Sequence, residues 1–189
     1  LSTSQHVYKT LENDINSSNP KNSLNLCKNF DEIADYVGQI SLNHSKTDGI
    51  STNTHLGSNF IIGGQIRGQE HALIMVYPVG NYIRASEIKP FFQLGETKYG
   101  KPILDRLIRN ETSLGDAARC ALVSFDSTMK SDLTVGPPID LVVYKKDSIQ
   151  ISLEEHLQFK TPFFSDLSSK WSEGLRNLFK ELPKFDWEK

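Results

Sequence analysis

The spacing of apolar residues changes along the chain from a helical period to a strand period and back, and this order limits the folds open to it. After the candidate caps Ser2 and Thr3, apolar residues return at every fourth position, namely Val7, Leu11 and Ile15. This spacing places them on one face and predicts a helix that ends near Asn16. The polar stretch 17–23 contains a proline and predicts a loop.

A second helix is expected to begin at Asp31. Its core-facing residues would be Ile33, Val37 and Ile40. The stretch 43–58 is polar and contains glycines, so it is not expected to continue this helix. The two helices should pack side by side.

The next part of the chain has the composition of β-strands. Residues 60–67 and 71–77 are rich in apolar and β-branched side chains, and Gly68-Gln69-Glu70 separates them. A turn at 78–81 leads into a third run, Tyr82-Ile83-Arg84. This pattern predicts a meander of antiparallel strands.

Helical spacing returns after Gly95. Pro102 suits the first turn of a short helix that ends at Ile108. A longer helix should follow Ser113, which forms a capping-box-like pair with Asp116. The expected buried face of this longer helix consists of Ala118, Leu122, Phe125 and Met129.

Two elements are expected in the last third of the chain. Residues 139–145 are rich in β-branched side chains and predict a strand. Residues 165–179 predict a helix with Leu167, Trp171, Leu175 and Leu178 on one face. The complete order of elements favours one α+β domain over residues 1–189, a four-layer αββα sandwich, with 160–189 as a carboxy-terminal helix and tail.

Charge and composition exclude several classes of function. Lys and Arg number 21 against 23 Asp and Glu, a net charge of -2, so a surface that neutralises many phosphates of nucleic acid is not expected. The apolar runs are far shorter than the ~20 residues of a membrane-spanning helix. Only Cys27 and Cys120 occur, without a C-x-x-C motif, which favours a reducing cytoplasm and no metal or other cofactor. Five scattered histidines disfavour a metalloprotease or a serine triad.

Two long motifs identify a family. The first is F-F-Q-L-G-E-T-K-Y-G-K-P-I-L-D-R, from Phe91, and the second is V-G-P-P-I-D-L-V-V-Y, ending at Tyr144. Both resemble the Anbu family of bacterial proteasome-type proteins, and the resemblance extends to 59–66 and 171–179. It implies the αββα sandwich of proteasome β-subunits, a ring-like or spiral homo-oligomer, and peptide or unfolded-protein substrates.

The resemblance also implies the chemistry. In this superfamily the first residue of the mature chain, a Thr, Ser or Cys, is the nucleophile and its own α-amine is the general base. Leu1 carries no nucleophilic atom. We therefore expect the chain to lack the first β-hairpin of the fold and, as given, to be inactive by itself.

Two segments are candidates for supporting that nucleophile. By resemblance, Asp132 and Thr134 would hydrogen-bond the α-amine, and Ser131 takes the place of Asp132 if the register shifts by one residue. The alternative is that these residues only cap a helix and shape a turn. Gly95, Glu96 and Thr97 lie where the superfamily has a Gly-Ser-Gly turn, and they are candidates for substrate binding. Glu96 and Lys98 could instead only pair across that turn.

Three functions therefore remain open. The first is a threonine-type endopeptidase that acts through an acyl-enzyme. The second is a non-catalytic assembly subunit, and the third is an amidase for small amides. The aromatic residues near the carboxy terminus, namely Trp171, Phe179, Phe185 and Trp187, predict either a subunit contact or packing on their own domain.

Overall fold

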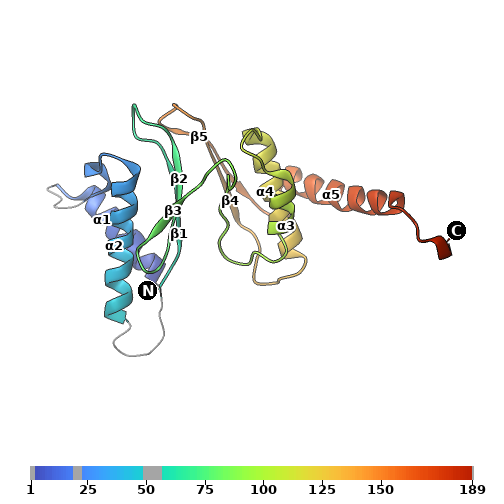
Figure 1. Ribbon diagram of the computed structural model, residues 1–189, viewed down its shortest axis with the longest axis horizontal. Helices are drawn as coiled ribbons and strands as arrows, with labels where there is room; N and C mark the ends of the chain where they lie inside the picture. The colour runs from blue at the N-terminus through green and yellow to red at the C-terminus, as the bar shows by residue number, and fades with distance from the viewer. Residues whose placement is uncertain (1–2, 19–22, 49–56, 189) are drawn as a thin grey trace. The chain divides into compact units, whose positions relative to one another are not determined.

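The computed structural model describes residues 3–18, 23–48 and 57–188 (Figure 1). Its fold class is α+β, as predicted. Internal contacts divide the chain into two compact units, Leu1–Leu94 with Tyr144–Gln150, and Gly95–Val143 with Ile151–Lys189. Each unit combines helices with strands. A single domain over the whole chain stays a prediction.

The helices of the first unit are α1 (Thr3–Asn16), a 3-10 turn η1 (Leu24–Leu26) and α2 (Phe30–Asp48). Helices α1 and α2 pack against each other, and α1 has the predicted bounds. We expected 43–58 not to continue the second helix. This was wrong for the first part of the stretch, because α2 continues to Asp48. Polarity alone does not end a helix, and the first glycine of that stretch is Gly49. The predicted cap Ser2 and residues 19–22 and 49–56 lie outside the described residues.

The start of α2 and its buried face follow from local chemistry. The Asn29 side chain accepts a hydrogen bond from the Glu32 backbone N–H at 2.9 Å, and the Glu32 carboxylate accepts one from Lys28 N–H at 2.7 Å. This arrangement satisfies backbone donors at the helix start. Val37 is buried as predicted, whereas Ile33 and Ile40 are only partly buried.

The predicted meander is confirmed as an antiparallel sheet with the order β1-β2-β3. Its strands are β1 (Phe60–Gly64), β2 (Ala72–Val76) and β3 (Tyr82–Arg84). Helix α2 covers the sheet, and a core cluster unites Phe30, Ala34, Ile74 and Val76. The turn after β2 approaches α2 closely. A Cβ at Gly38 would lie 2.4 Å from the carbonyl oxygen of Gly80, which itself has φ 88°.

The second unit contains the remaining elements, except that Tyr144, the last residue of β4, belongs to the first unit. They are α3 (Lys101–Leu107), α4 (Leu114–Met129), β4 (Ile139–Tyr144), β5 (Ile151–Leu157), α5 (Pro162–Glu181) and a 3-10 turn η2 (Asp186–Glu188). Strands β4 and β5 form a two-stranded sheet. The sequence did not predict β5, because Glu155 interrupts the apolar alternation of Ile151, Leu153 and Leu157.

Helix α4 is the central element of this unit. Its predicted cap is confirmed, since Ser113 Oγ accepts a hydrogen bond from Asp116 N–H at 3.1 Å and donates one to the Asp116 carboxylate at 2.7 Å. The predicted buried face was wrong for Phe125, which is 45% exposed. The buried residues of α4 include three polar ones, Ser124, Asp126 and Thr128, which an apolar pattern does not detect.

A polar network joins α4 to α5. The Asp126 carboxylate is buried, and it accepts hydrogen bonds from Lys130 Nζ at 2.8 Å and Ser168 Oγ at 2.5 Å. Lys130 Nζ also donates to Ser172 Oγ at 2.7 Å. The core cluster of the unit consists of Leu122, Ile139, Leu157 and Phe164. None of the helices in the described ranges is long and apolar enough to cross a membrane.

Gly100 sets the distance between α3 and α4. A Cβ at this position would lie 2.1 Å from Ser124 Oγ and 2.9 Å from both the Ser124 carbonyl oxygen and Thr128 Oγ1. The backbone of Gly100 is in the ordinary right-handed region, with φ -93°. Space, and not backbone conformation, therefore requires glycine at this position.

We predict that Gly100→Ala lowers the free energy of unfolding by ~1–3 kcal/mol, because the added methyl group overlaps a packed helix. Chemical denaturation of the protein would measure this loss. The matched control is Gly115→Ala in α4, where a Cβ would meet nothing closer than 3.9 Å. That control should be neutral or stabilising by up to ~1 kcal/mol. Equal effects of the two substitutions would contradict the proposed close contact.

Candidate functional site

The segment predicted to support a nucleophile follows the end of α4. The backbone N–H groups of Ser131 and Asp132 both donate to the Thr128 carbonyl, at 2.9 Å and 2.8 Å. One Asp132 carboxylate oxygen accepts hydrogen bonds from Thr134 N–H at 2.8 Å and Thr134 Oγ1 at 2.7 Å. The predicted turn-shaping role of Asp132 and Thr134 is therefore present. Ser131 and Thr134 are exposed, and Asp132 is partly exposed.

These contacts keep Asp132 ionised. The hydroxyl and then the backbone N–H of Thr134 lower the pKa of Asp132 below its usual value, and the positive charge of Lys98 lowers it further. A carboxylate offers about four acceptor positions, and Thr134 uses two of them. An ionised carboxylate with room for another donor is suited to bind an amine.

The second predicted segment, 95–97, forms a turn before α3. Gly95 has φ 82°, in the left-handed region that favours glycine, and a Cβ there would meet no atom within 4 Å. The Glu96 carboxylate accepts a hydrogen bond from the Lys98 backbone N–H at 2.8 Å. Glu96 thus closes the turn through the backbone of Lys98. The Lys101 N–H then donates to the Thr97 carbonyl at 3.0 Å.

The structure brings the two segments to the same end of α4. Gly100 places the 95–100 loop against Ser124 and Thr128, while Thr128 anchors the 131–134 segment through its carbonyl oxygen. Lys98 is close enough to influence Asp132 electrostatically. Sequence reasoning considered Lys98 as a partner of Glu96 that could neutralise the effect of its carboxylate on the α-amine, and it gave no role to Gly100. The motif G-E-T-K-Y-G-K contains both residues but does not show what they face.

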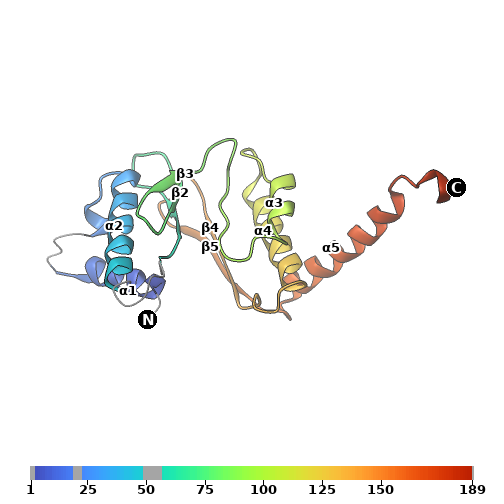
Figure 2. The same ribbon diagram turned by 60° about the horizontal axis from the view of Figure 1, so that its bottom comes forward.

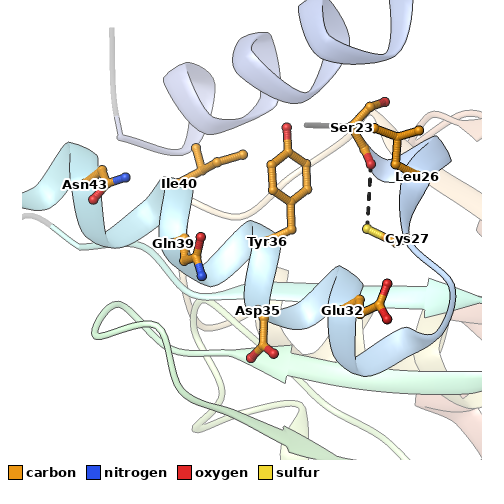
Figure 3. A pocket seen from close by; sticks show the side chains of 9 residues that line it. All are labelled: Ser23, Leu26, Cys27, Glu32, Asp35, Tyr36, Gln39, Ile40 and Asn43. Carbon is orange, nitrogen blue, oxygen red and sulfur yellow. Dashed lines mark hydrogen bonds between the residues drawn. The ribbon is translucent and has the colours of Figure 1, made fainter. Parts of the chain in front are cut away.

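A separate hollow of about 370 Å³ lies in the first unit, against α2 and η1 (Figure 3). One lining residue is Cys27, whose Sγ donates a hydrogen bond to the Ser23 carbonyl oxygen at 3.7 Å. Burial, and then the negative charge of Glu32, raise the pKa of Cys27. A protonated thiol is a poor nucleophile, so Cys27 is not a candidate nucleophile. The described residues also contain no group of three or more His, Cys, Asp or Glu that could hold a metal ion.

No known family model and no curated protein matches the chain. Solved structures do match it. Anbu (ancestral beta-subunit) from Yersinia bercovieri superposes with a TM-score of 0.92 at 34% sequence identity, covering 98% of this chain and 78% of that one. The chain belongs to the Anbu family. The predicted family is confirmed.

Two further Anbu structures agree with this assignment. The structure described as the helical assembly of the Anbu complex from Pseudomonas aeruginosa has a TM-score of 0.89 and 41% identity, and covers 98% of this chain and 77% of that one. An Anbu (Gly-1) mutant from Hyphomicrobium sp. strain MC1 has a TM-score of 0.89 and 39% identity, with the same coverage of 98% and 77%. The protein is therefore proteasome-related.

The Asp132 turn gives a testable titration. We predict that Thr134→Ala raises the pKa of Asp132 toward its usual value, because the hydroxyl of Thr134 is the largest cause of its depression. The pKa should stay below the usual value, since the backbone N–H of residue 134 and Lys98 remain. NMR titration of the Asp132 carboxyl carbon would measure both shifts.

The matched control is Thr134→Ser, which keeps the hydroxyl and should leave the pKa of Asp132 low. Since folding lowers this pKa, the ionised carboxylate stabilises the turn at neutral pH. That contribution is lost as the pH falls through the pKa of the folded state. An unchanged pKa in the alanine variant would contradict the hydrogen-bond assignment.

Proposed function

We propose that the protein is a proteasome-like peptidase of the N-terminal nucleophile type, which hydrolyses peptide bonds in peptides or unfolded proteins through an acyl-enzyme. The nucleophile would be the first residue of the mature protein, a threonine by resemblance, and its α-amine would be the general base. The observation that supports this proposal is that the last turns of α4 hold both the 131–134 segment, through the Thr128 carbonyl, and the 95–100 loop, through Gly100, with the charge of Lys98 acting on Asp132.

Each residue of the 131–134 segment has a role in this proposal. Asp132 accepts a hydrogen bond from the α-amine and orients its lone pair toward the proton of the nucleophile. The Thr134 hydroxyl already donates to Asp132, so its oxygen can accept a second bond from the amine. Ser131 is exposed and next to Asp132, and it would perform the same task in the alternative register.

Lys98 has an electrostatic role. The α-amine must be neutral to act as a base, and its reference pKa is about 7.7–8.0. A carboxylate nearby raises that pKa and so disfavours the neutral form. The charge of Lys98, which already acts on Asp132, opposes this effect and keeps part of the amine unprotonated at neutral pH.

The 95–97 turn is the proposed substrate-binding segment. The open space around Gly95 leaves its backbone accessible to an extended peptide. Backbone groups of such a segment can hydrogen-bond a peptide strand without reading its side chains. No cofactor is required by this chemistry. We further propose a cytoplasmic, ring-like or spiral homo-oligomer, which the helical assembly of the Pseudomonas relative supports.

Activity can be tested on the mature protein. We predict cleavage of fluorogenic peptides and covalent labelling of the terminal residue by a peptide epoxyketone. Thr134→Ala and Asp132→Ala should each lower kcat/KM by ~10-fold or more, as part of the roughly 10²–10⁴-fold that base catalysis contributes. The matched control is Asp105→Asn, which removes another exposed carboxylate of the same unit and should retain activity.

The outcomes separate the three functions. Labelling together with peptide cleavage supports the peptidase. A correctly folded, processed protein that is neither labelled nor active would instead be a non-catalytic assembly subunit. Turnover of small amides without peptide cleavage would identify an amidase that uses the same terminal base.

A further inference from the structure

The loop between β4 and β5, residues 145–150, is attached to the turn between β1 and β2, residues 65–71. By its contacts this loop belongs to the first unit, whereas the strand residues on either side of it, 139–143 and 151–157, belong to the second. The chain therefore passes from the second unit into the first and back within a few residues. The sheet that carries the attachment point lies beside α2 in both views (Figures 1 and 2).

One side chain, Gln65, makes most of the attachment. Its Nε2 donates hydrogen bonds to the Asp147 carboxylate at 2.6 Å and to the Gln69 carbonyl oxygen at 2.7 Å. Its Oε1 accepts hydrogen bonds from the Tyr144 hydroxyl at 2.8 Å and from the Asp147 backbone N–H at 2.7 Å. An amide side chain has two N–H donors and two acceptor positions, and Gln65 uses all four. Only one orientation of this amide fits, because the reverse would place Oε1 beside two oxygens.

An ion pair on the same turn adds little to this attachment. Lys146 Nζ lies 2.9 Å from Glu70 Oε2, and both side chains are largely exposed. Exposed ion pairs stabilise proteins weakly, because water screens them and both side chains lose freedom. The Gln65 amide is therefore the main bond between the loop and the turn.

The attached loop has an unfavourable backbone conformation. Asp147 has φ 64° and Ile149 has φ 50°, and among the residues that the structure describes no other non-glycine residue has a positive φ. An aspartate tolerates this left-handed region, but a β-branched side chain such as that of Ile149 is strained there. The hydrogen bonds of Gln65 thus hold a backbone that favours release.

We propose that residues 145–150 form a releasable strap with two states. In the closed state the Gln65 amide holds the strap on the β1–β2 turn. In the open state these hydrogen bonds are broken, and the backbone of Asp147 and Ile149 relaxes to negative φ. The closed strap moves with the first unit, and the open strap moves with the strands of the second unit that carry it. This conformational device does not depend on the proposed hydrolysis.

Amide hydrogen exchange, measured by NMR on the protein, can detect the open state. The Asp147 N–H bonds to Gln65 itself, whereas the Ser148 N–H bonds to the Lys145 carbonyl oxygen at 3.1 Å, inside the strap. Ser148 therefore reports release of the whole strap, and not the loss of one bond. In the wild-type protein we expect its exchange to be independent of low denaturant concentrations. Exchange of the buried Ile74 in β2 should instead rise steeply with denaturant, as global unfolding does.

Gln65→Glu is the variant that opens the strap. It keeps the shape of the side chain but replaces both donors by an oxygen beside the Asp147 carboxylate. The protection factors of the Asp147 and Ser148 amides should fall together by ~10-fold or more at neutral pH. The matched control is Gln69→Ala, which removes a side chain bonded to the Lys28 carbonyl oxygen and keeps the backbone carbonyl that Gln65 uses.

A second pair of variants tests the backbone conformation. Ile149→Asn and Ile149→Thr both replace the apolar side chain by a polar one, but asparagine accepts positive φ and the β-branched threonine does not. The closed state should therefore be favoured in the asparagine variant. The Ser148 amide should be protected ~5-fold more strongly there than in the threonine variant.

Three results would overturn the proposal. In the first, Gln65→Glu leaves the protection of Ser148 unchanged, so that the strap does not depend on Gln65. In the second, exchange at Ser148 in the wild-type protein has the same denaturant dependence as at Ile74, so that the strap opens only when the whole protein unfolds. In the third, the two Ile149 variants protect Ser148 equally, so that the backbone does not favour release.

Discussion

The candidate site depends on one close contact, the packing of Gly100 against the last turns of α4. That contact leaves no room for a Cβ beside Ser124 and Thr128. It fixes the 95–100 loop to the same turn of helix that anchors Ser131 and Asp132 through the Thr128 carbonyl. A loop displaced from α4 would separate Lys98 from Asp132, and the lowered pKa of Asp132 would lose its contribution from that charge.

Helix α4 also positions α5, through a buried carboxylate. Asp126 would be unfavourable in an apolar interior without partners, and Lys130 and Ser168 supply them. The candidate site thus lies at the end of α4, and the same helix holds the first half of α5 through Ser168 and Ser172. Along α5, Phe164 is buried and Trp171 is partly buried, whereas Leu175 and the described residues after it are exposed.

Local patterns predicted much of the fold, and the failures have local causes. The Ser113 cap and the three-stranded meander were predictable because neighbouring residues determine them. Strand β5 was missed because Glu155 breaks its alternation, and Phe125 was misplaced because α4 buries polar residues that an apolar pattern ignores. In the site, the Asp132–Thr134 turn is local and was foreseen. The effect of Lys98 on Asp132 was not, because only the tertiary fold brings those segments together.

The central claim is that the 131–134 segment supports the α-amine of a terminal nucleophile. A crystal structure of the mature protein with a peptide epoxyketone bound to that residue tests it most directly. The account predicts that a side-chain oxygen of Ser131, Asp132 or Thr134 lies within ~3.2 Å of the amine nitrogen, the reach of a hydrogen bond. An adduct whose amine lies beyond hydrogen-bond distance of all three side chains would contradict it.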